Sequence, residues 1–316
     1  MKQITLTDLL LKYGDENEAR ALLERLRWNG TPVCPRCGTI QEHKFTAREG
    51  TKTHARKGVY FCSDCRKQFT VTVGTIMESS HIPLAKWIGA FFLMCASKKG
   101  ISALQMQRML GVTYKTAWFM NHRIRFAMDE SSSDMVLSGT VEADETYIGG
   151  KPRVGDGKTH TKGRGTEKTA VMVLVERNGK ARTQVIPDAQ SSTLKGVIRE
   201  YVDPSSRIMT DEHNSYKGIG KEFAGGHHTV NHGKKEYSRG DINSNTAESF
   251  FALLKRGVYG SFHHISKQHT PKYINEFAFR WNNRDITDGE RMQVAFSQIE
   301  GKRLLYREPK IRGGNA

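Results

Sequence analysis

Two pairs of cysteines constrain the first part of this chain more than any other feature of its sequence. Cys34 and Cys37 form one CxxC turn, and Cys62 and Cys65 form a second. Each turn offers two thiolates, and four thiolates complete the tetrahedral coordination of one zinc ion. Because no ligand position is left open, we expect a structural zinc ribbon over residues 31–75, the alternative being two unrelated turns. Paired CxxC motifs also favour a reducing compartment over a disulfide framework.

The charge balance indicates a polyanionic partner. The 316 residues include 49 Lys and Arg against 33 Asp and Glu, a formal net charge of +16. The basic residues are spread along the chain, which favours an extended track of DNA or RNA. The most apolar stretch, residues 82–96, is interrupted by Lys86 and is too short to cross a bilayer. We therefore predict a cytoplasmic, nucleoid-associated protein without a membrane partner.

The region between the cysteines and the middle of the chain predicts helices. Residues 1–30 show apolar positions at helical spacing, and they form an N-terminal helical segment. Residues 76–130 contain three further helical patterns, and the last two are joined by a turn at Gly111. A helix, a Gly-containing turn and a basic helix are typical of a helix-turn-helix, although a plain three-helix packing unit gives the same pattern. The candidate DNA contacts on this basic segment are Lys115, Arg123 and Arg125.

After a polar linker the pattern changes to strands. Apolar runs at 140–148, 169–176 and 181–186 read as strands, and Asn178-Gly179 between the last two is a strong hairpin signal. Helical patterns follow, with a short strand at 207–210. A hairpin-rich sheet followed by helices predicts an α/β fold of the ribonuclease-H-like kind. We expect this catalytic domain over residues 135–290 and a basic tail over 291–316.

Three acids and one lysine carry the chemistry of this second half. Asp144 and Asp211 each end a short apolar run, and Glu248 lies on a helical pattern with Lys255 two turns later. Carboxylate oxygens brought together from distant positions suit hard divalent cations. A lysine beside them suits a phosphate backbone. The pattern therefore predicts two-metal phosphoryl-transfer chemistry on nucleic acid.

Each acid also has a structural alternative. Asp is common at strand ends, where its side chain stabilises turns, and this applies to Asp144 and to Asp211. Asn245 and Glu248 have the spacing of a helix capping box. The alternatives do not explain Lys255, and they leave the two strand-end acids unrelated. Capping and metal binding by Glu248 are also compatible with each other.

Several segments in this half resemble the DDE-type transposases of bacterial insertion sequences, in the group with an N-terminal zinc ribbon. The resemblance covers nearly the whole chain from about Cys34 to Arg284. The segments that carry it are Val141-Glu-Ala-Asp144-Glu-Thr-Tyr-Ile-Gly-Gly150, Thr210-Asp211-Glu-His-Asn-Ser-Tyr216, Val230-Asn-His232, Asn245-Thr-Ala-Glu248, Lys255-Arg256-Gly257 and Glu276-Phe-Ala-Phe-Arg280-Trp-Asn-Asn-Arg284.

The resemblance implies a ribonuclease-H-like catalytic domain with two Mg²⁺ ions, or Mn²⁺ in their place. Asp144, Asp211 and Glu248 would then be the metal ligands, and Lys255 matches the lysine of the family. It also implies cleavage of the terminal inverted repeats of a transposon and their joining to target DNA. Holding two ends at once implies a homodimer or a larger assembly. Basic residues of the same helices are candidate phosphate contacts: Arg256, Arg280 and Arg284, of which the last two could instead form an ion-pair ladder with Glu276.

Two other classes of protein remain open at this point. One is a transcription regulator whose zinc ribbon and helix-turn-helix bind DNA while the second half only dimerises. The other is a structure-selective nuclease of the same fold, which cuts junctions but does not join ends. Magnesium-dependent nicking would exclude the first, and strand joining would exclude the second.

Overall fold

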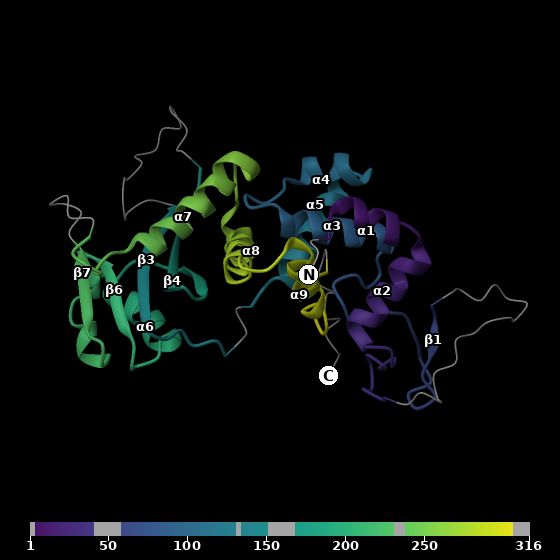
Figure 1. The fold of residues 1–316 in the computed structure, drawn as a ribbon, viewed down its shortest axis with the longest axis horizontal. Helices are drawn as coiled ribbons and strands as arrows, with labels where there is room; N and C mark the ends of the chain where they lie inside the picture. Colours follow the sequence, from purple (N-terminus) through teal and green to yellow (C-terminus); the bar gives the residue numbers. More distant parts are fainter. Residues whose placement is uncertain (1–3, 41–57, 131–133, 151–167, 231–237, 306–316) are drawn as a thin grey trace, which may run out of the picture. The chain divides into compact units, whose positions relative to one another are not determined.

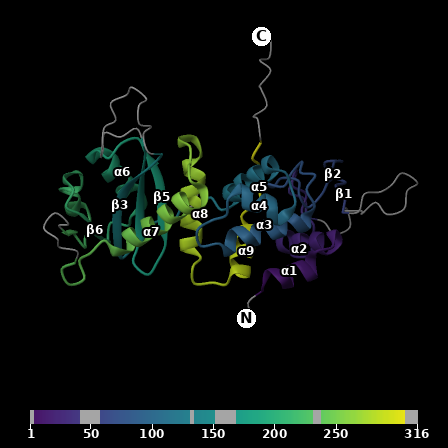
Figure 2. The same ribbon diagram turned by 90° about the horizontal axis from the view of Figure 1, so that it is seen from above.

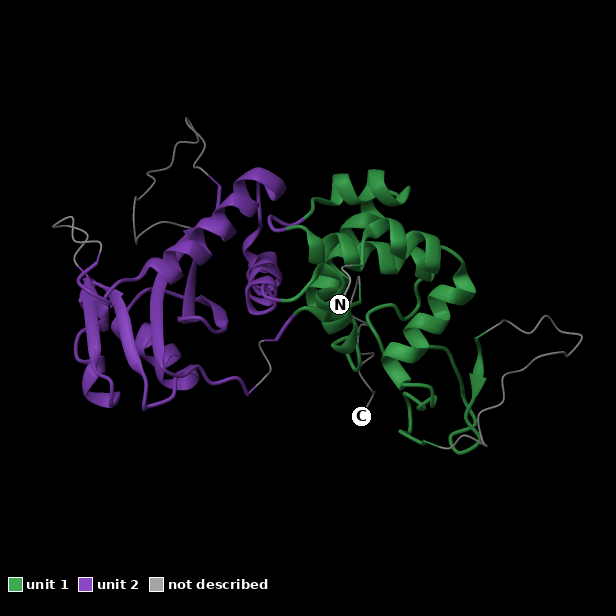
Figure 3. Cartoon of the chain, in the orientation of Figure 1, with its two compact units in different colours: residues 1–97, 101–128, 286–316 green, residues 98–100, 129–285 purple. Residues whose placement is uncertain are grey.

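The computed structural model describes residues 4–40, 58–130, 134–150, 168–230 and 238–305. The chain divides into two compact units, coloured separately in Figure 3. Unit 1 comprises residues 1–97, 101–128 and 286–316, and unit 2 comprises residues 98–100 and 129–285. The chain therefore enters unit 2 from the middle of unit 1 and returns to unit 1 at its end.

The described residues of unit 1 form helices and one small hairpin. A capping box between Thr5 and Asp8 begins its first helix, and Ser102 and Thr113 cap the two helices of the helix-turn-helix pattern. Its elements are α1 (Leu6–Tyr13), α2 (Glu16–Trp28), β1 (Tyr60–Phe61), β2 (Gln68–Phe69), α3 (Leu84–Ala96), α4 (Ala103–Leu110), α5 (Tyr114–Ala127) and α9 (Asp288–Ser297).

The helix α3 is the centre of unit 1. Its sequence is apolar on nearly every side, and most of its residues are buried. The last helix, α9, packs on it: Phe296 stacks on Phe91 with ring centroids 4.1 Å apart, and Arg291 donates to the carbonyl of Cys95 over 2.8 Å. The expected boundary at residue 290 therefore lies inside a helix. The apolar face of α9 completes the core of unit 1, where the sequence had suggested the start of a tail.

Unit 2 is built on a mixed sheet, so the predicted α/β class is confirmed. The strand order is β5-β4-β3-β6-β7, with β3, β4 and β5 antiparallel and with β6 parallel to both β3 and β7. Its elements are β3 (Thr140–Ile148), β4 (Thr169–Glu176), β5 (Ala181–Ile186), α6 (Ser191–Tyr201), β6 (Arg207–Asp211), β7 (His227–Val230), α7 (Asn245–Gly257) and α8 (Thr270–Asn282). Short 3₁₀ turns lie at Asn214–Tyr216, Ile219–Glu222 and Lys267–His269, and a π-helical turn at Val258–Phe262 continues α7.

Helices cover both faces of this sheet, as Figure 2 shows from above. On one face, Leu194 and Ile198 of α6 pack against Ala143 and Leu174. On the other face, α7 and α8 enclose a second core that includes Val173 of β4. Alternation of side chains along β3 and β4 therefore sends one set of residues to each core. In Figure 1, α7 runs across the sheet on the second face.

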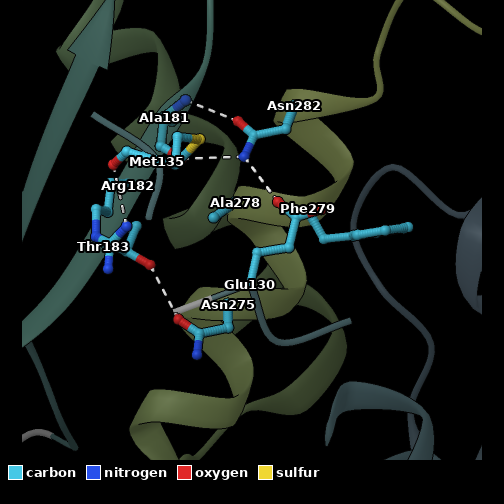
Figure 4. Close-up of a pocket in the computed structure, with 9 residues that line it drawn as sticks. All are labelled: Glu130, Met135, Ala181, Arg182, Thr183, Asn275, Ala278, Phe279 and Asn282. Carbon is cyan, nitrogen blue, oxygen red and sulfur yellow. Dashed lines mark hydrogen bonds between the residues drawn. The ribbon is translucent and has the colours of Figure 1, made fainter. Parts of the chain in front are cut away.

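The edge strand β5 is covered by α8 through two asparagines, drawn in Figure 4. The Asn282 side chain accepts from the backbone N–H of Ala181 over 2.7 Å and donates to the carbonyl of the same residue over 3.1 Å. Two helical turns before Asn282, the side chain of Asn275 accepts a hydrogen bond from the Thr183 hydroxyl over 3.2 Å. An amide side chain thus replaces a neighbouring strand at this edge, which protects it from pairing with another chain.

Candidate active site

Two of the predicted acids lie side by side at the centre of the sheet. Glu142 pairs in parallel with Met209, and the same register continued by two residues places Asp144 of β3 level with Asp211 of β6. Neighbouring strands are about 4.8 Å apart, so both carboxylates lie on the same face at adjacent positions. Asp144 is also directly opposite Val173 of β4, whose side chain belongs to the core under α7.

The third acid comes from α7, which lies over that same face. Phe250 and Leu254 are fully buried against the sheet, while Glu248 and Lys255 are exposed along the helix. Glu248 lies in the first turn, and Lys255 lies in the last turn with its ammonium 5.9 Å from the ring centre of Phe251. The predicted division of this helix into an apolar face and a face carrying Glu and Lys is therefore what the structure shows.

The carboxylates influence one another. The pKa of Asp144 is raised to about 7, first by burial and then by the charges of Glu145, Asp211 and Glu248. Burial also raises the pKa of Asp211, and the charge of Glu145 adds to this effect. Burial is the larger cause and neighbouring negative charge the smaller one, and a divalent cation would favour the ionised form of both acids.

A fourth carboxylate, Glu145, follows Asp144 on β3 and was not singled out in the sequence; it is on the opposite face of the strand, where it meets Tyr216 of the core under α6. The buried phenol of Tyr216 donates to Glu145 over 2.6 Å. The burial of Tyr216 and the charge of Glu145 raise the pKa of that phenol well above its usual range. Both residues lie in segments that carried the family resemblance, but neither spacing nor periodicity indicated that they meet. Tyr216 thus fixes an acid that borders the two aspartates.

The helix α7 is held at its start by a buried acid on β3. Glu142 is 0% exposed, and it accepts hydrogen bonds from the backbone N–H groups of Thr246 (2.7 Å) and Ala247 (2.9 Å). The hydroxyl of Thr246 donates to the same carboxylate over 2.9 Å, and Arg177 forms an ion pair with it at 2.6 Å. Arg177 also donates to the carbonyls of Asp241 and Asn243, over 2.6 and 2.8 Å.

This contact replaces the capping box expected within the helix sequence. The N-cap residue is Ser244 and not Asn245, and it makes no capping hydrogen bond with its side chain. The first N–H groups of α7 instead bond Glu142, which lies two residues before Asp144 on the same face of β3. The capping box weighed as the alternative for Asn245 and Glu248 does not form, because a carboxylate distant in sequence satisfies the donors that a local cap would serve. Strand β3 therefore supplies one acid and anchors the helix that supplies another.

The donor set suits magnesium. Asp144, Asp211 and Glu248 offer hard carboxylate oxygens, the ligands that Mg²⁺ prefers. Among the residues with described positions, these acids are not gathered within 4.8 Å of one another, unlike the cysteines below. A pair of ions about 4 Å apart takes ligands spread over a wider space than one ion does. The chemistry of the donors and their shared face fit such a centre.

The four cysteines of unit 1 come together as predicted. Their sulfur atoms lie within 4.8 Å of one another, with Cys34 and Cys65 3.7 Å apart and Cys37 and Cys62 3.6 Å apart. The adjacent hairpin packs on Trp28 of α2, whose ring meets the edge of Tyr60 at 5.4 Å. Four sulfur ligands and no open position fit one structural zinc ion.

The predicted DNA contacts fall into two groups. Lys115 and Arg256 are exposed, as a phosphate contact requires. Arg125 is 1% exposed and Arg123 7%, so both lie inside unit 1 and not on an open helix surface.

The two arginines of α8 are engaged within unit 2. Arg280 is buried beside Glu276 and pairs with it, which is the ion pair weighed as the alternative. Arg284 donates to the carbonyls of Gly179 and Trp281, over 2.8 and 2.9 Å. His232, which also matched the family pattern, lies outside the described residues. The described helices include none that is both long and apolar enough to span a membrane.

Known proteins share both parts of this architecture. Residues 136–282 match the ISXO2-like transposase domain, and residues 14–68 match the transposase zinc-ribbon domain. Over 280 residues the chain is 30% identical to an uncharacterized protein in transposable element ISH50 of Halobacterium salinarum. The aligned region covers 85% of this chain and 91% of that protein. Over 108 residues it is 34% identical to an uncharacterized transposase-like protein of Haemophilus influenzae, covering 34% of this chain and 85% of that one. No solved structure matches the chain significantly.

These similarities define the class as transposases with an N-terminal zinc ribbon, which confirms the resemblance found in the sequence. The chain belongs to the ISXO2-like transposase family.

Proposed function

We propose that this protein is a DNA transposase that cleaves the ends of an insertion sequence and joins them to target DNA. The observation that carries the proposal is the placement of Asp144 and Asp211 on adjacent strands beneath α7, with pKa values raised by burial and by neighbouring acids. Unit 2 would be the ribonuclease-H-like catalytic domain. Its three antiparallel strands are continued by two parallel ones, and the acids lie on the central pair.

In the proposed mechanism, Asp144 and Asp211 would hold a metal centre from the sheet, and Glu248 would hold it from α7. Mg²⁺ bound there would supply activation of the attacking oxygen and stabilisation of the leaving oxygen. The exposed ammonium of Lys255, two turns along the same helix face, meets the DNA backbone and sets its direction across the site. Glu142 keeps the first turn of α7 at a fixed distance from β3, and with it Glu248.

Two successive displacements would follow in this site. A water oxygen attacks the phosphorus at the transposon end, the bond from phosphorus to the 3′-oxygen breaks, and a free 3′-hydroxyl remains. That hydroxyl then attacks a phosphorus of the target strand and displaces the 3′-oxygen there, so this second step exchanges one phosphodiester bond for another. Joining both transposon ends requires that they be held at once, which makes an assembly of at least two copies part of the proposal.

The decisive experiment separates binding from chemistry. Asp144→Asn, Asp211→Asn and Glu248→Gln are compared with wild type on plasmid DNA that carries the sequences flanking this gene, with Mg²⁺ present. We expect end binding to persist while nicking and strand transfer are lost. Glu200→Gln, an exposed acid on α6 across the sheet, is the matched control and should retain activity.

The same assay decides among the alternatives. Strand transfer that survives all three changes would refute the metal-ligand assignment. Sequence-specific binding without any Mg²⁺-dependent nicking would identify a regulator. Cleavage of branched DNA without joining would identify a structure-selective nuclease.

A further inference from the structure

We propose that a pocket beside α5 receives one unpaired nucleotide of a DNA strand, with the phosphate on Arg123 and the base against Phe119 and Ile82. The inference rests on the proposed function only in taking DNA as the partner. The pocket lies within unit 1, and it has a volume of about 460 Å³. Pockets that bind small organic ligands fall in the range of roughly 300–1,000 Å³, so its size suits a nucleotide.

Two elements of unit 1 form the pocket. Along α5, Lys115, Phe119 and Arg123 follow one another at intervals of one helical turn, so they line one side in a row. The segment at residues 79–82 and Trp87 of α3 form the facing side. The indole N–H of Trp87 donates to the hydroxyl of Ser80 over 3.1 Å, which fixes that segment against the helix.

The buried arginine points to an anionic ligand. The guanidinium of Arg123 lies 4.5 Å from the ring centre of Phe119, and one of its terminal nitrogens donates to the carbonyl of Glu78 over 3.3 Å. Its Nε is buried and has no hydrogen-bond partner among the described residues. Buried donors are nearly always satisfied in folded proteins. The planar fork of an arginine matches the oxygens of a phosphate, which would use this donor.

The surrounding charges favour an anion as well. Arg303 lies close enough that its charge, together with burial, lowers the pKa of Arg123. The acid in the vicinity is Glu78, whose carboxylate pairs with Arg303 at 3.5 Å and accepts from the backbone N–H of Gly74 over 3.0 Å. With exposed Lys115 at one end of the row, the cations of the site exceed its acids. A phosphate on Arg123 would restore the balance.

The apolar side of the pocket distinguishes a nucleotide from a free phosphate. Ile82 and Phe119 line it with partly exposed apolar surface that a phosphate ion would leave uncovered, whereas Trp87 and Met120 are already buried. Proteins that bind single strands combine basic residues with aromatic rings on which bases stack. A base within a duplex is covered on both faces by its neighbours, so it enters a concave pocket only when it is unpaired and unstacked. Helix α5 is the recognition position of the helix-turn-helix pattern, which places DNA beside it.

The test uses the full-length, zinc-loaded protein in buffer without Mg²⁺, so that binding is measured without cleavage. Two fluorescein-labelled duplexes share one sequence, and one of them carries a single unpaired thymidine. Fluorescence anisotropy at fixed salt should show about tenfold tighter binding of the duplex with the unpaired base, the gain expected from one stacked base. Phe119→Leu and Arg123→Lys should each bring the ratio of affinities towards one.

An exposed arginine on α4 provides the matched control. Arg108→Gln removes a cation away from the pocket, so it should weaken both duplexes equally and leave the ratio unchanged. A second readout does not depend on the fold of a variant. With 4-thiothymidine at the unpaired position, ultraviolet crosslinking to the wild-type protein should place the adduct in residues 79–87 or 115–123.

Two results would overturn the proposal. One is a ratio near one for the wild type, or a ratio that both pocket variants leave intact while circular dichroism shows them folded. The other is a crosslink outside the two segments. Because these measurements omit Mg²⁺, they can fail while the acids remain essential for cleavage, and the pocket alone is then refuted. A protein that binds neither duplex would refute the DNA-based function itself.

Discussion

The buried carboxylate of Glu142 is the contact on which the position of Glu248 depends. Glu142→Ala removes the acceptor of three hydrogen bonds from the first turn of α7 and of the ion pair with Arg177. We expect the first turn of α7 to become less ordered. Mg²⁺-dependent cleavage should then fall, although all three proposed metal ligands remain. Glu142→Gln keeps one acceptor oxygen, so its effect should be intermediate.

The size of the effect follows from the surroundings of the pair. Removing one partner of a buried ion pair costs about 3–5 kcal/mol, because the other charge is left uncompensated. Arg177 is 22% exposed and keeps its two carbonyl acceptors, so we expect the low end, about 3 kcal/mol. For Glu142→Gln, loss of a charged hydrogen bond suggests about 1.5–3 kcal/mol.

Hydrogen exchange measured by mass spectrometry tests this locally, since it reports the opening of single segments. A loss of about 3 kcal/mol corresponds to roughly a hundredfold faster exchange in residues 243–257, because about 1.4 kcal/mol is a factor of ten. Glu222→Ala is the matched control: its pair with Arg199 has the same 2.6 Å length but is exposed. It should leave exchange in α7 unchanged.

The reasoning fails on either of two results. If Glu142→Ala leaves the exchange of α7 as slow as in the wild type, the carboxylate does not hold the helix. If exchange accelerates as expected while cleavage keeps its rate and its dependence on Mg²⁺ concentration, the start of α7 does not position Glu248 for catalysis.

Three further predictions concern separate parts of the molecule. Burial raises the pKa of Asp144 from 3.8 to about 7, so the folded protein retains a proton that the unfolded chain releases, and Mg²⁺-free stability falls as pH rises between those values. Asp144→Asn should remove this decline, and a melting temperature with unchanged pH dependence would contradict it. Chelation of zinc should accelerate hydrogen exchange in residues 58–71 and leave β4 protected. An equal loss of protection in both segments would show that they unfold together. Asn282→Ala removes both bonds to Ala181 and should cost about 1–3 kcal/mol in local opening of β5, whereas Asn283→Ala removes a bond to the carbonyl of Phe279 on α8 and should not affect β5 exchange.

Local signals in the sequence predicted much of unit 2. The bounds of β3, β4 and β5 agree with the predicted runs, because apolar patterning and a hairpin signal act within a few residues. Asn178 adopts the left-handed conformation, with φ 59°, that an Asn-Gly turn tolerates. Asp211 ends β6 as expected, but Asp144 lies in the middle of β3, so the two aspartates are brought together by the parallel register of the strands and not by a shared strand end.

The parts that sequence reasoning missed depend on contacts between distant segments. Strand β7 has only four residues, and its first two are the polar pair His227-His228, so its sequence shows no strand pattern. Its pairing with β6 defines it as a strand. Glu142 reads as one polar residue in an alternating strand, and only the docking of α7 makes it an anchor. The interior positions of Arg123 and Arg125 likewise follow from tertiary packing, whereas their charge alone favours the surface.

The return of the chain to unit 1 has a consequence for its synthesis. Phe296, which covers Phe91 in the core of unit 1, leaves the ribosome only after all of unit 2. Domains fold during translation in the order in which they emerge. The N-terminal part of unit 1 therefore keeps an uncovered apolar face while the sheet of unit 2 forms. A product truncated after residue 285 would contain every strand of the sheet and leave its first domain unfinished.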